Sequence, residues 1–568
     1  MAAENRESSF FRYLSLISLL SNVRTNSKSE LSTCCNNVRS YKIGRVNKGS
    51  ILVLILSYLV SSILHLLATI GVNYRPYQAW VIPFGITTAV AGWLTDAFIG
   101  RYKMIRCSVW IMWLLTITAT VSAVVGQLDE TCYRYIKIIN SVLLCLLSIG
   151  LGGFQANIVQ LGLDQLHDAS TTEIKSFITW YVSTLIGAGF IVEFNFYCLS
   201  EQRKIFILLF TCLTLSLALI VLICCNHWLI KEPATQSPFK LIYKVIKFAS
   251  VTKHPRCRSA FTYCEDELPS RIDFGKSKYG GPFTTEQVED VKTFLRLLPL
   301  IAFIGAALSA LTASSYLFIY LEKQYNLFKG SNLNSQLESR KVLTECYTET
   351  SMTSTVYLGV TLLIILHEFL LYPLFHRCIC HAGIKSIWKL TMGIALQLLR
   401  IIALIVLNIH SRRSILNNSR LNLSTIECAF HYAHGQLSET HSDQWLAILQ
   451  YLHFISLTLI LIGTFEFICS QVPYSMKGVI IGAQYTLILI GLIPILAMVL
   501  FFKLDFSIWG EGIISCEFWY ALVVLVANLV IFLASMCLAK RYKMRKRDDL
   551  LPNEHFFAER YYSSDTCT

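Results

Sequence analysis

Long apolar runs alternate with shorter polar segments along most of the chain. Many runs reach about 20 residues, the length that an α-helix needs to cross ~30 Å of hydrocarbon. The pattern predicts about twelve spans, at 51–70, 81–99, 107–126, 138–158, 176–196, 205–225, 296–320, 355–375, 387–409, 445–469, 478–502 and 518–538. Because these runs are too long for the buried helices of a soluble core, we expect an all-α polytopic membrane protein.

Charge placement predicts which side of the membrane each polar segment occupies. The N-terminal segment 1–50 is basic, and the tail 539–568 opens with a dense run of Lys and Arg. Positive charge against span ends is typical of the cytosolic side, and an even number of spans puts both termini there. The N-x-S/T sequons at Asn417 and Asn422 fall in the loop 410–444 on the opposite side, where glycosylation takes place.

A polar, basic connection at 226–295 divides the spans equally. It predicts two six-helix bundles, 51–225 and 296–538, joined by a cytosolic linker. Such spacing is typical of the major facilitator architecture, in which two bundles enclose a site near the midplane of the membrane. Other twelve-span folds remain open on spacing alone. Near the end of the linker, Thr284 and Gln287 have capping-box spacing, so we expect a helix to begin there and continue into the seventh span.

Composition excludes several classes of protein. Of 568 residues, 54% are hydrophobic and 15% are charged, against about 25% charged residues in soluble domains. Disorder and a soluble enzyme are therefore not expected. The net charge of +13 is concentrated beside the spans, which favours contact with anionic lipid over binding of nucleic acid. The sequence has no phosphate-binding loop and no nucleophile elbow, so we expect neither ATP-driven transport nor an enzyme, and we expect no cofactor or metal.

The second span ends in a specific motif. Residues 92–103 match G-x-x-x-D-x-x-x-G-R-x-K through Gly92, Asp96, Gly100, Arg101 and Lys103. Glycines allow close backbone approach, and an acid among basic neighbours at a membrane boundary can form a charge-assisted contact. The motif resembles the hallmark of the major facilitator superfamily. We therefore interpret it as a gating element that holds one face of a transporter closed; an ordinary basic loop is the alternative.

Further stretches resemble one family of that superfamily, the proton-dependent oligopeptide transporters. They are 151–165 with Gln155, the Trp180-Tyr181 pair, 279–292, the weaker 368–374, and 466–477, which is similar to E-F-x-x-S-Q-x-P-x-S-M-K. The resemblance implies two bundles that alternately expose a site for small peptides or peptide-like solutes. The span-two and span-ten motifs carry most of its specificity.

The chain also departs from that family. Its first span has neither the acids nor the Arg of the family's E-x-x-E-R motif, and Gln155 stands where family members carry a span-four Lys. A neutral amide can donate a hydrogen bond to a carboxylate but supplies no charge. Proton coupling by the family's usual groups is therefore not implied, and coupling remains open.

Ionisable residues inside spans are functional candidates because charge is costly there. The resemblance places Glu466 on the pathway, where it is expected to bind substrate and a proton; an internal salt bridge is the alternative. Glu368 with His367 forms a second candidate proton relay, against a structural pair. Arg400 either pairs with an intramembrane acid or binds an anionic solute. The other candidates are His65, expected to pack between helices, and Glu193 near the end of its span.

Four further residues are expected to line the substrate site. Gln155 and Asn157 offer amide groups, and Trp180 and Tyr181 offer aromatic faces for a side chain or a cation. For the aromatic pair, packing between helices is the equal alternative.

Three functions are compatible with the sequence. The first is a secondary transporter of oligopeptides or similar solutes, working by alternating access with or without protons. The second is a transport-deficient sensor or scaffold whose basic segments bind a cytosolic protein. The third is a carrier for a solute other than a peptide. The expected location is the plasma membrane or an endolysosomal membrane.

Overall fold

A computed structural model describes most of the chain between residues 48 and 541. The described residues are 48–72, 81–128, 133–166, 169, 171–196, 201–234, 237–251, 270–330, 356–371, 386–418, 439–473, 476–504 and 516–541. The N-terminal segment 1–47, the tail 542–568 and Asn422 lie outside these residues.

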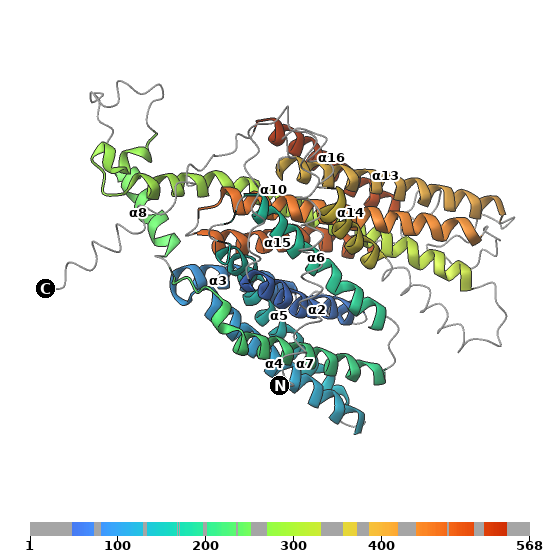
Figure 1. The fold of residues 1–568 in the computed structure, drawn as a ribbon. Helices are drawn as coiled ribbons and strands as arrows, with labels where there is room; N and C mark the ends of the chain where they lie inside the picture. The colour runs from blue at the N-terminus through green and yellow to red at the C-terminus, as the bar shows by residue number, and fades with distance from the viewer. Residues whose placement is uncertain are drawn as a thin grey trace, which may run out of the picture. The chain divides into compact units, whose positions relative to one another are not determined.

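Helices lie on all of the expected spans within the described residues (Figure 1). The first half contains α2 (Lys48–Val72), α3 (Val81–Leu94), α4 (Arg101–Leu128), α5 (Tyr133–Asp164), α6 (Thr171–Phe196) and α7 (Glu201–Cys224). The second half contains α10 (Thr285–Gly330), an unlabelled helix at 356–366, α13 (Ser386–Asn418), α14 (Glu439–Gln471), α15 (Lys477–Leu504) and α16 (Cys516–Arg541). The sequence pattern therefore predicted the helices well, and mainly their ends differ.

Length and apolarity identify the helices able to cross a membrane. Within the described residues seven helices meet both conditions, and three shorter apolar helices accompany them. Their outer faces are apolar as well. On α3, Ile82, Ile86 and Val90 are exposed at four-residue spacing, whereas Thr88 and Ala91 are buried on another face. A stripe of large exposed apolar side chains is stable in lipid and unfavourable in water, so these helices belong to an integral membrane protein.

Two sets of helices form the buried interior. Side chains of α2, α4, α5, α6 and α7 build one apolar cluster, which also takes in residues of 356–366 and α14. A second cluster draws mainly on α10, α13, α14 and α15. The helices α13 and α14 pack along each other, as Figure 1 shows, while α3 of the first half packs on α15 of the second. Contacts between the halves thus run mainly through α3 and α15 and, more sparsely, through α6 with α14, α5 with α15, and the first half with the helix at 356–366.

The connection between the halves is partly helical. After η3 (Asn226–Trp228) comes the amphipathic helix α8 (Pro238–Val251), which buries Ile242 and Val245. The short helices η4 (Asp273–Gly275) and η5 (Ser277–Tyr279) lead to α10. The predicted capping box is confirmed, because Gln287 N donates to Thr284 Oγ1 and Thr284 N donates to Gln287 Oε1, each at 3.2 Å. That the segments 1–50, 226–295 and 539–568 are cytosolic stays a prediction.

A buried carboxylate fastens this linker to α10. Asp273 accepts hydrogen bonds from Ser270 N at 2.9 Å and from Lys292 Nζ at 2.9 Å, and Lys276 Nζ lies 2.7 Å away. Partial burial by itself raises the pKa of the Asp273 carboxyl, but the hydrogen bonds from Lys276, Ser270 and Lys292 outweigh it and hold that pKa well below its usual range. The carboxylate therefore stabilises the fold fully above an unfolded-state pKa of about 3.9, and this stability is lost as the pH falls toward the lowered pKa.

We expect Asp273→Asn to lower the free energy of unfolding at neutral pH by about 1.5–3 kcal/mol, the value of hydrogen bonds to a charged group. Thermal unfolding of the purified protein measures the loss. The difference between wild type and variant should shrink below about pH 4 as the wild-type carboxylate takes up a proton. Glu286→Gln changes an exposed acid of the same segment and serves as the control. A difference that stays constant down to the lowest pH would contradict the role of the carboxylate.

Candidate functional site

The motif at residues 92–103 forms the turn between α3 and α4. Helix α3 passes into a π-helical turn, η1 (Thr95–Ile99), and Gly100 ends it with φ at 83° while its N–H donates to Thr95 O at 3.1 Å. Positive φ favours glycine at this position. The turn allows α4 to start at once, so that Asp96 and Arg101, from two different helices, come close together.

A polar cluster, called here the latch, joins three helices of the first half to α15. Asp96 Oδ2 accepts a hydrogen bond from Val479 N at 3.0 Å and a second one from the Gly478 N–H. Arg101 donates to Asp164 at the end of α5 and lies 3.9 Å from Asp96 Oδ1. The backbone N–H groups belong to the first turn of α15, where the helix dipole favours a negative charge.

Glycines allow the helices to approach closely at the latch. A β-carbon on Gly478 would lie 2.7 Å from both carboxylate oxygens of Asp96, and one on Gly92 would collide with the Gly478 carbonyl. The structure therefore brings together Gly92, Asp96 and Arg101 of the predicted gating motif. Lys103, by contrast, is exposed and does not join the cluster.

The predicted substrate residues Gln155 and Tyr181 meet more than two helical turns along α5 from Asp164 of the latch. Gln155 Nε2 donates to the Tyr181 hydroxyl at 3.0 Å, and Gln155 also hydrogen-bonds the side chain of Tyr485 on α15. Tyr181 packs edge-on against Phe465 of α14, with ring centroids 5.4 Å apart. Gln155, Tyr181 and Phe465 are fully buried. These side chains thus close the two halves on each other at the latch end.

Trp180 and Asn157 occupy different places. The Trp180 ring packs on Phe369 of the η6 turn (His367–Leu371), with centroids 5.7 Å apart. Asn157 Nδ2 donates within α5 to Gly153 O at 2.8 Å, and Asn157 Oδ1 has no hydrogen-bond partner among the described residues. Residues two apart on a helix point in nearly opposite directions, so Asn157 does not share the face of Gln155. In this conformation both aromatic side chains pack between helices, and their contact with substrate stays a prediction.

Glu466 is paired inside the second half. Its side chain is 1% exposed, and its Oε1 accepts a hydrogen bond from Lys389 Nζ of α13 at 2.6 Å. The neighbouring Phe465 points to Tyr181, so Glu466 projects from another face of α14. The internal salt bridge considered for Glu466 is therefore present, and whether this acid also binds protons or substrate stays a prediction.

Glu368 and His367 lie together at the latch end of the structure. The His367 Nδ1 atom is 3.6 Å from Glu368 Oε1, and Ser176 of α6 donates to Glu368 Oε2 at 3.1 Å. His367 is half exposed, at 49% of its side chain, whereas Glu368 is mostly buried. Glu368 thus links the two halves through Ser176, and its part in a proton relay stays a prediction.

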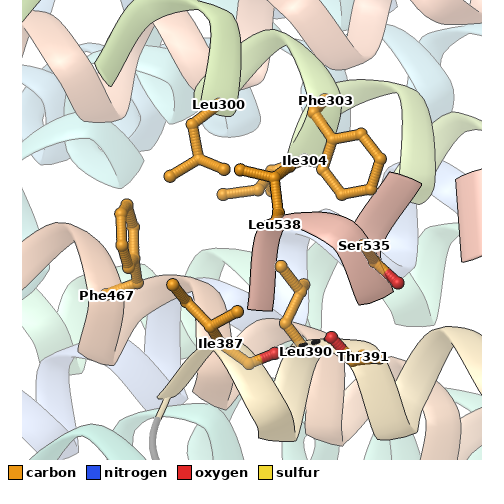
Figure 2. A pocket seen from close by; sticks show the side chains of 9 residues that line it. All are labelled: Leu300, Phe303, Ile304, Ile387, Leu390, Thr391, Phe467, Ser535 and Leu538. Atoms are coloured by element: carbon orange, nitrogen blue, oxygen red, sulfur yellow. Dashed lines mark hydrogen bonds between the residues drawn. The ribbon is translucent and has the colours of Figure 1, made fainter. Parts of the chain in front are cut away.

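A small cavity lies elsewhere, between α10, α13, α14 and α16 (Figure 2). Its walls are almost wholly apolar, with Leu300, Ile304, Leu390 and Phe467 pointing into it. The volume of about 10 Å³ is near the minimum for one water. It therefore has no room for an organic solute. Of the two sequons, Asn417 belongs to the last turn of α13, and Asn422 is outside the described residues.

Comparison with known proteins decides the family. The family model PTR2, described as the POT family, matches residues 102–500, more than half of the chain. The chain belongs to the POT family. The family consists of transporters, so the resemblance seen in the sequence is confirmed at this level, and so is the major facilitator fold with two six-helix bundles.

Curated relatives of the POT chain are distant. Human solute carrier family 15 member 5 is 26% identical over 255 residues, which cover 41% of this chain and 43% of that protein. The Arabidopsis thaliana protein NRT1/PTR FAMILY 6.4 is 22% identical over 494 residues and 78% of each chain.

Solved structures agree on the fold. An auto-inhibited POT family peptide transporter aligns with a TM-score of 0.54 at 16% identity, over 88% of this chain and 98% of its own. The POT family transporter PepTSo aligns with a TM-score of 0.51 at 15% identity, over 88% and 99%. At such identities the likeness shows the fold and not the substrate.

Sequence reasoning missed three partners in this POT chain. Asp164 lies in the stretch 151–165 that resembles the family, but no neighbouring residue in the sequence indicates that it pairs with Arg101. Lys389 is a single cation at the start of a span, and Tyr485 is one of several aromatic residues in an apolar run. Only their contacts in space set them apart.

Proposed function

We propose that this POT family chain is a secondary transporter that carries oligopeptides or similar small organic solutes by alternating access. The observation that carries the proposal is the closure between the halves at one end. The latch joins α3 and α4 to α15, and Gln155 contacts Tyr181 and Tyr485. Contacts of this kind can break and re-form as two rigid bundles rock about a central site.

Sidedness and membrane are part of the proposal. We place the latch, the linker and both termini in the cytosol, at the plasma membrane or an endolysosomal membrane. Lys540 and Arg541 in the last turn of α16 and the exposed Lys240, Lys244 and Lys247 of α8 support this orientation.

Coupling to protons is the finer part of the proposal. The two candidate proton sites are Glu466 with Lys389 and Glu368 with His367. Glu368 supports a link between protonation and conformation, because Ser176 of the opposite half donates to its carboxylate. A proton on Oε2 would replace this charge-assisted hydrogen bond with a weaker neutral one and loosen the closed end.

Uptake into proteoliposomes tests the function. We expect saturable uptake of radiolabelled di- or tripeptides that rises with an inward proton gradient and falls in Glu466→Gln. Uptake that does not depend on the proton gradient would contradict proton coupling but would still support the function as a carrier. Saturable peptide binding without any accumulation would instead support the second candidate, a transport-deficient sensor. The neutral Gln155 in place of the family's Lys favours that candidate.

A further inference from the structure

Arg400 of α13 is a buried cation whose described partners are all neutral. The residue is 1% exposed and lies between α10, α13 and α14. Its Nε donates to Leu449 O at 3.1 Å, and its Nη1 donates to Ser314 Oγ at 2.7 Å and to His453 Nδ1 at 3.1 Å. Among the residues that the structure describes, no Asp or Glu forms an ion pair with it. Such a charge inside a membrane protein is costly to keep and points to a functional site.

The protonation of His453 follows from this geometry. Because Arg400 Nη1 is the donor, His453 Nδ1 is the acceptor and the ring is neutral, with its proton on Nε2 facing Ser315 Oγ at 3.4 Å. Hydroxyl and imidazole dipoles spread the positive charge but do not cancel it. Nη1 uses both of its hydrogens on Ser314 and His453, while Nη2 donates to no described residue. On the edge of the guanidinium formed by Nη1 and Nη2, only Nη1 therefore donates to described residues, and these are neutral.

The side chains around Arg400 differ in their exposure. His453 and Ser315 are partly exposed, whereas Arg400 and Ser314 are buried behind them. The ring of His453 packs on Phe454, Phe454 on Tyr357 and Tyr357 on His65 of α2, at centroid distances of 5.2, 4.3 and 5.5 Å. The cluster is thus connected by packed rings to the contact between the two halves, and His453 covers Arg400.

We propose that Arg400 binds a carboxylate group of the transported solute. When no solute is bound, His453 Nδ1 accepts the Arg400 hydrogen bond that the carboxylate would otherwise accept. When His453 turns away, Nη1 and Nη2 offer two parallel N–H groups, the geometry that matches a carboxylate. The Ser315 hydroxyl donates to Leu311 O at 3.2 Å and can rotate to supply a further donor beside the carboxylate. The inference rests on the proposed function and adds to it the group of the solute that is recognised, a free carboxylate, and the place of its recognition, α13 in the second half of the protein.

Thermal stabilisation of the purified protein tests the site without requiring transport. The probes are benzoate and the uncharged benzamide, with chloride at equal ionic strength. We expect benzoate to raise the melting temperature in a saturable way and the other two to have no such effect. Arg400→Gln should abolish the benzoate effect, and His453→Ala should strengthen benzoate binding by removing the competing acceptor. Arg541→Gln, which removes an exposed cation of α16, is the matched control.

If Arg400→Gln does not fold, benzoate binding is measured with Arg400→Lys instead. This variant keeps the charge but loses the planar fork, so benzoate binding should weaken about tenfold. Equal stabilisation by chloride, no stabilisation of the wild type, or an unchanged benzoate effect in Arg400→Lys would overturn the proposal. If Arg400-dependent benzoate binding is found but proteoliposomes take up no solute, the site stands and the transport function falls.

Discussion

Replacing Gly478 with valine is expected to reduce solute uptake to background while leaving solute binding in place. A β-carbon at this position would lie 2.7 Å from the carboxylate of Asp96 and from the Gly92 carbonyl, closer than packed atoms can approach. Overpacking of this kind costs about 1–3 kcal/mol. Because the cost falls only on the state with the latch closed, it lowers the population of that state relative to the open state by about 5- to 150-fold. A carrier that cannot close one end cannot complete its cycle.

The experiment needs a glycine between the halves that tolerates a side chain. Gly187 of α6 is suitable, since a β-carbon there would meet its nearest neighbour, the methyl group of Thr361, at 3.5 Å. Gly187→Ala should therefore transport normally. Uptake by Gly478→Val in proteoliposomes is compared with solute binding to the same purified protein. Normal uptake by Gly478→Val would show that the α3–α15 contact does not take part in the cycle.

Sequence alone predicted the features that depend on neighbouring residues. The spans follow from apolar length, and the capping box at Thr284 follows from a three-residue spacing that one helical turn satisfies. The motif at 92–103 stood out for the same reason, because Gly100 and Arg101 are adjacent residues that end one helix and begin the next; its gating role stays a prediction. Such features need no knowledge of how distant segments pack.

The sequence did not predict which residues far apart in the chain contact each other. Asp96 meets Val479 across 383 positions, and Lys389 meets Glu466 across 77. Either contact depends on which faces of two helices are packed together, and many apolar patterns are compatible with several such packings. Arg400 illustrates the limit: the sequence left an intramembrane acid or an anionic solute open as its partner, and the described partners are a serine, a histidine, a backbone carbonyl and the face of the Phe318 ring.

Removing Lys389 is expected to destabilise the protein more than removing the charge of Glu466. In Lys389→Met the Glu466 carboxylate, 1% exposed, loses its described partner, and breaking a buried pair from one side costs about 3–5 kcal/mol. In Glu466→Gln the lysine, 24% exposed, can reach a polar surface, so the loss should be smaller. The double variant should recover most of the stability of the wild type. Thermal unfolding of the four proteins gives the interaction energy, and additive losses would contradict a direct pair.

Gradient dependence of uptake in the same four proteins then separates the two interpretations of Glu466. A purely structural pair predicts that the double variant regains both stability and gradient-driven uptake, because no charge is left unpaired. A proton site predicts that the double variant regains stability only, because the amide introduced by Glu466→Gln cannot take up and release a proton. The two interpretations therefore predict the same stability for the double variant but different gradient-driven uptake. Loss of coupling can therefore be assigned to the ionisable pair of Glu466 and Lys389 and not to a weakened fold.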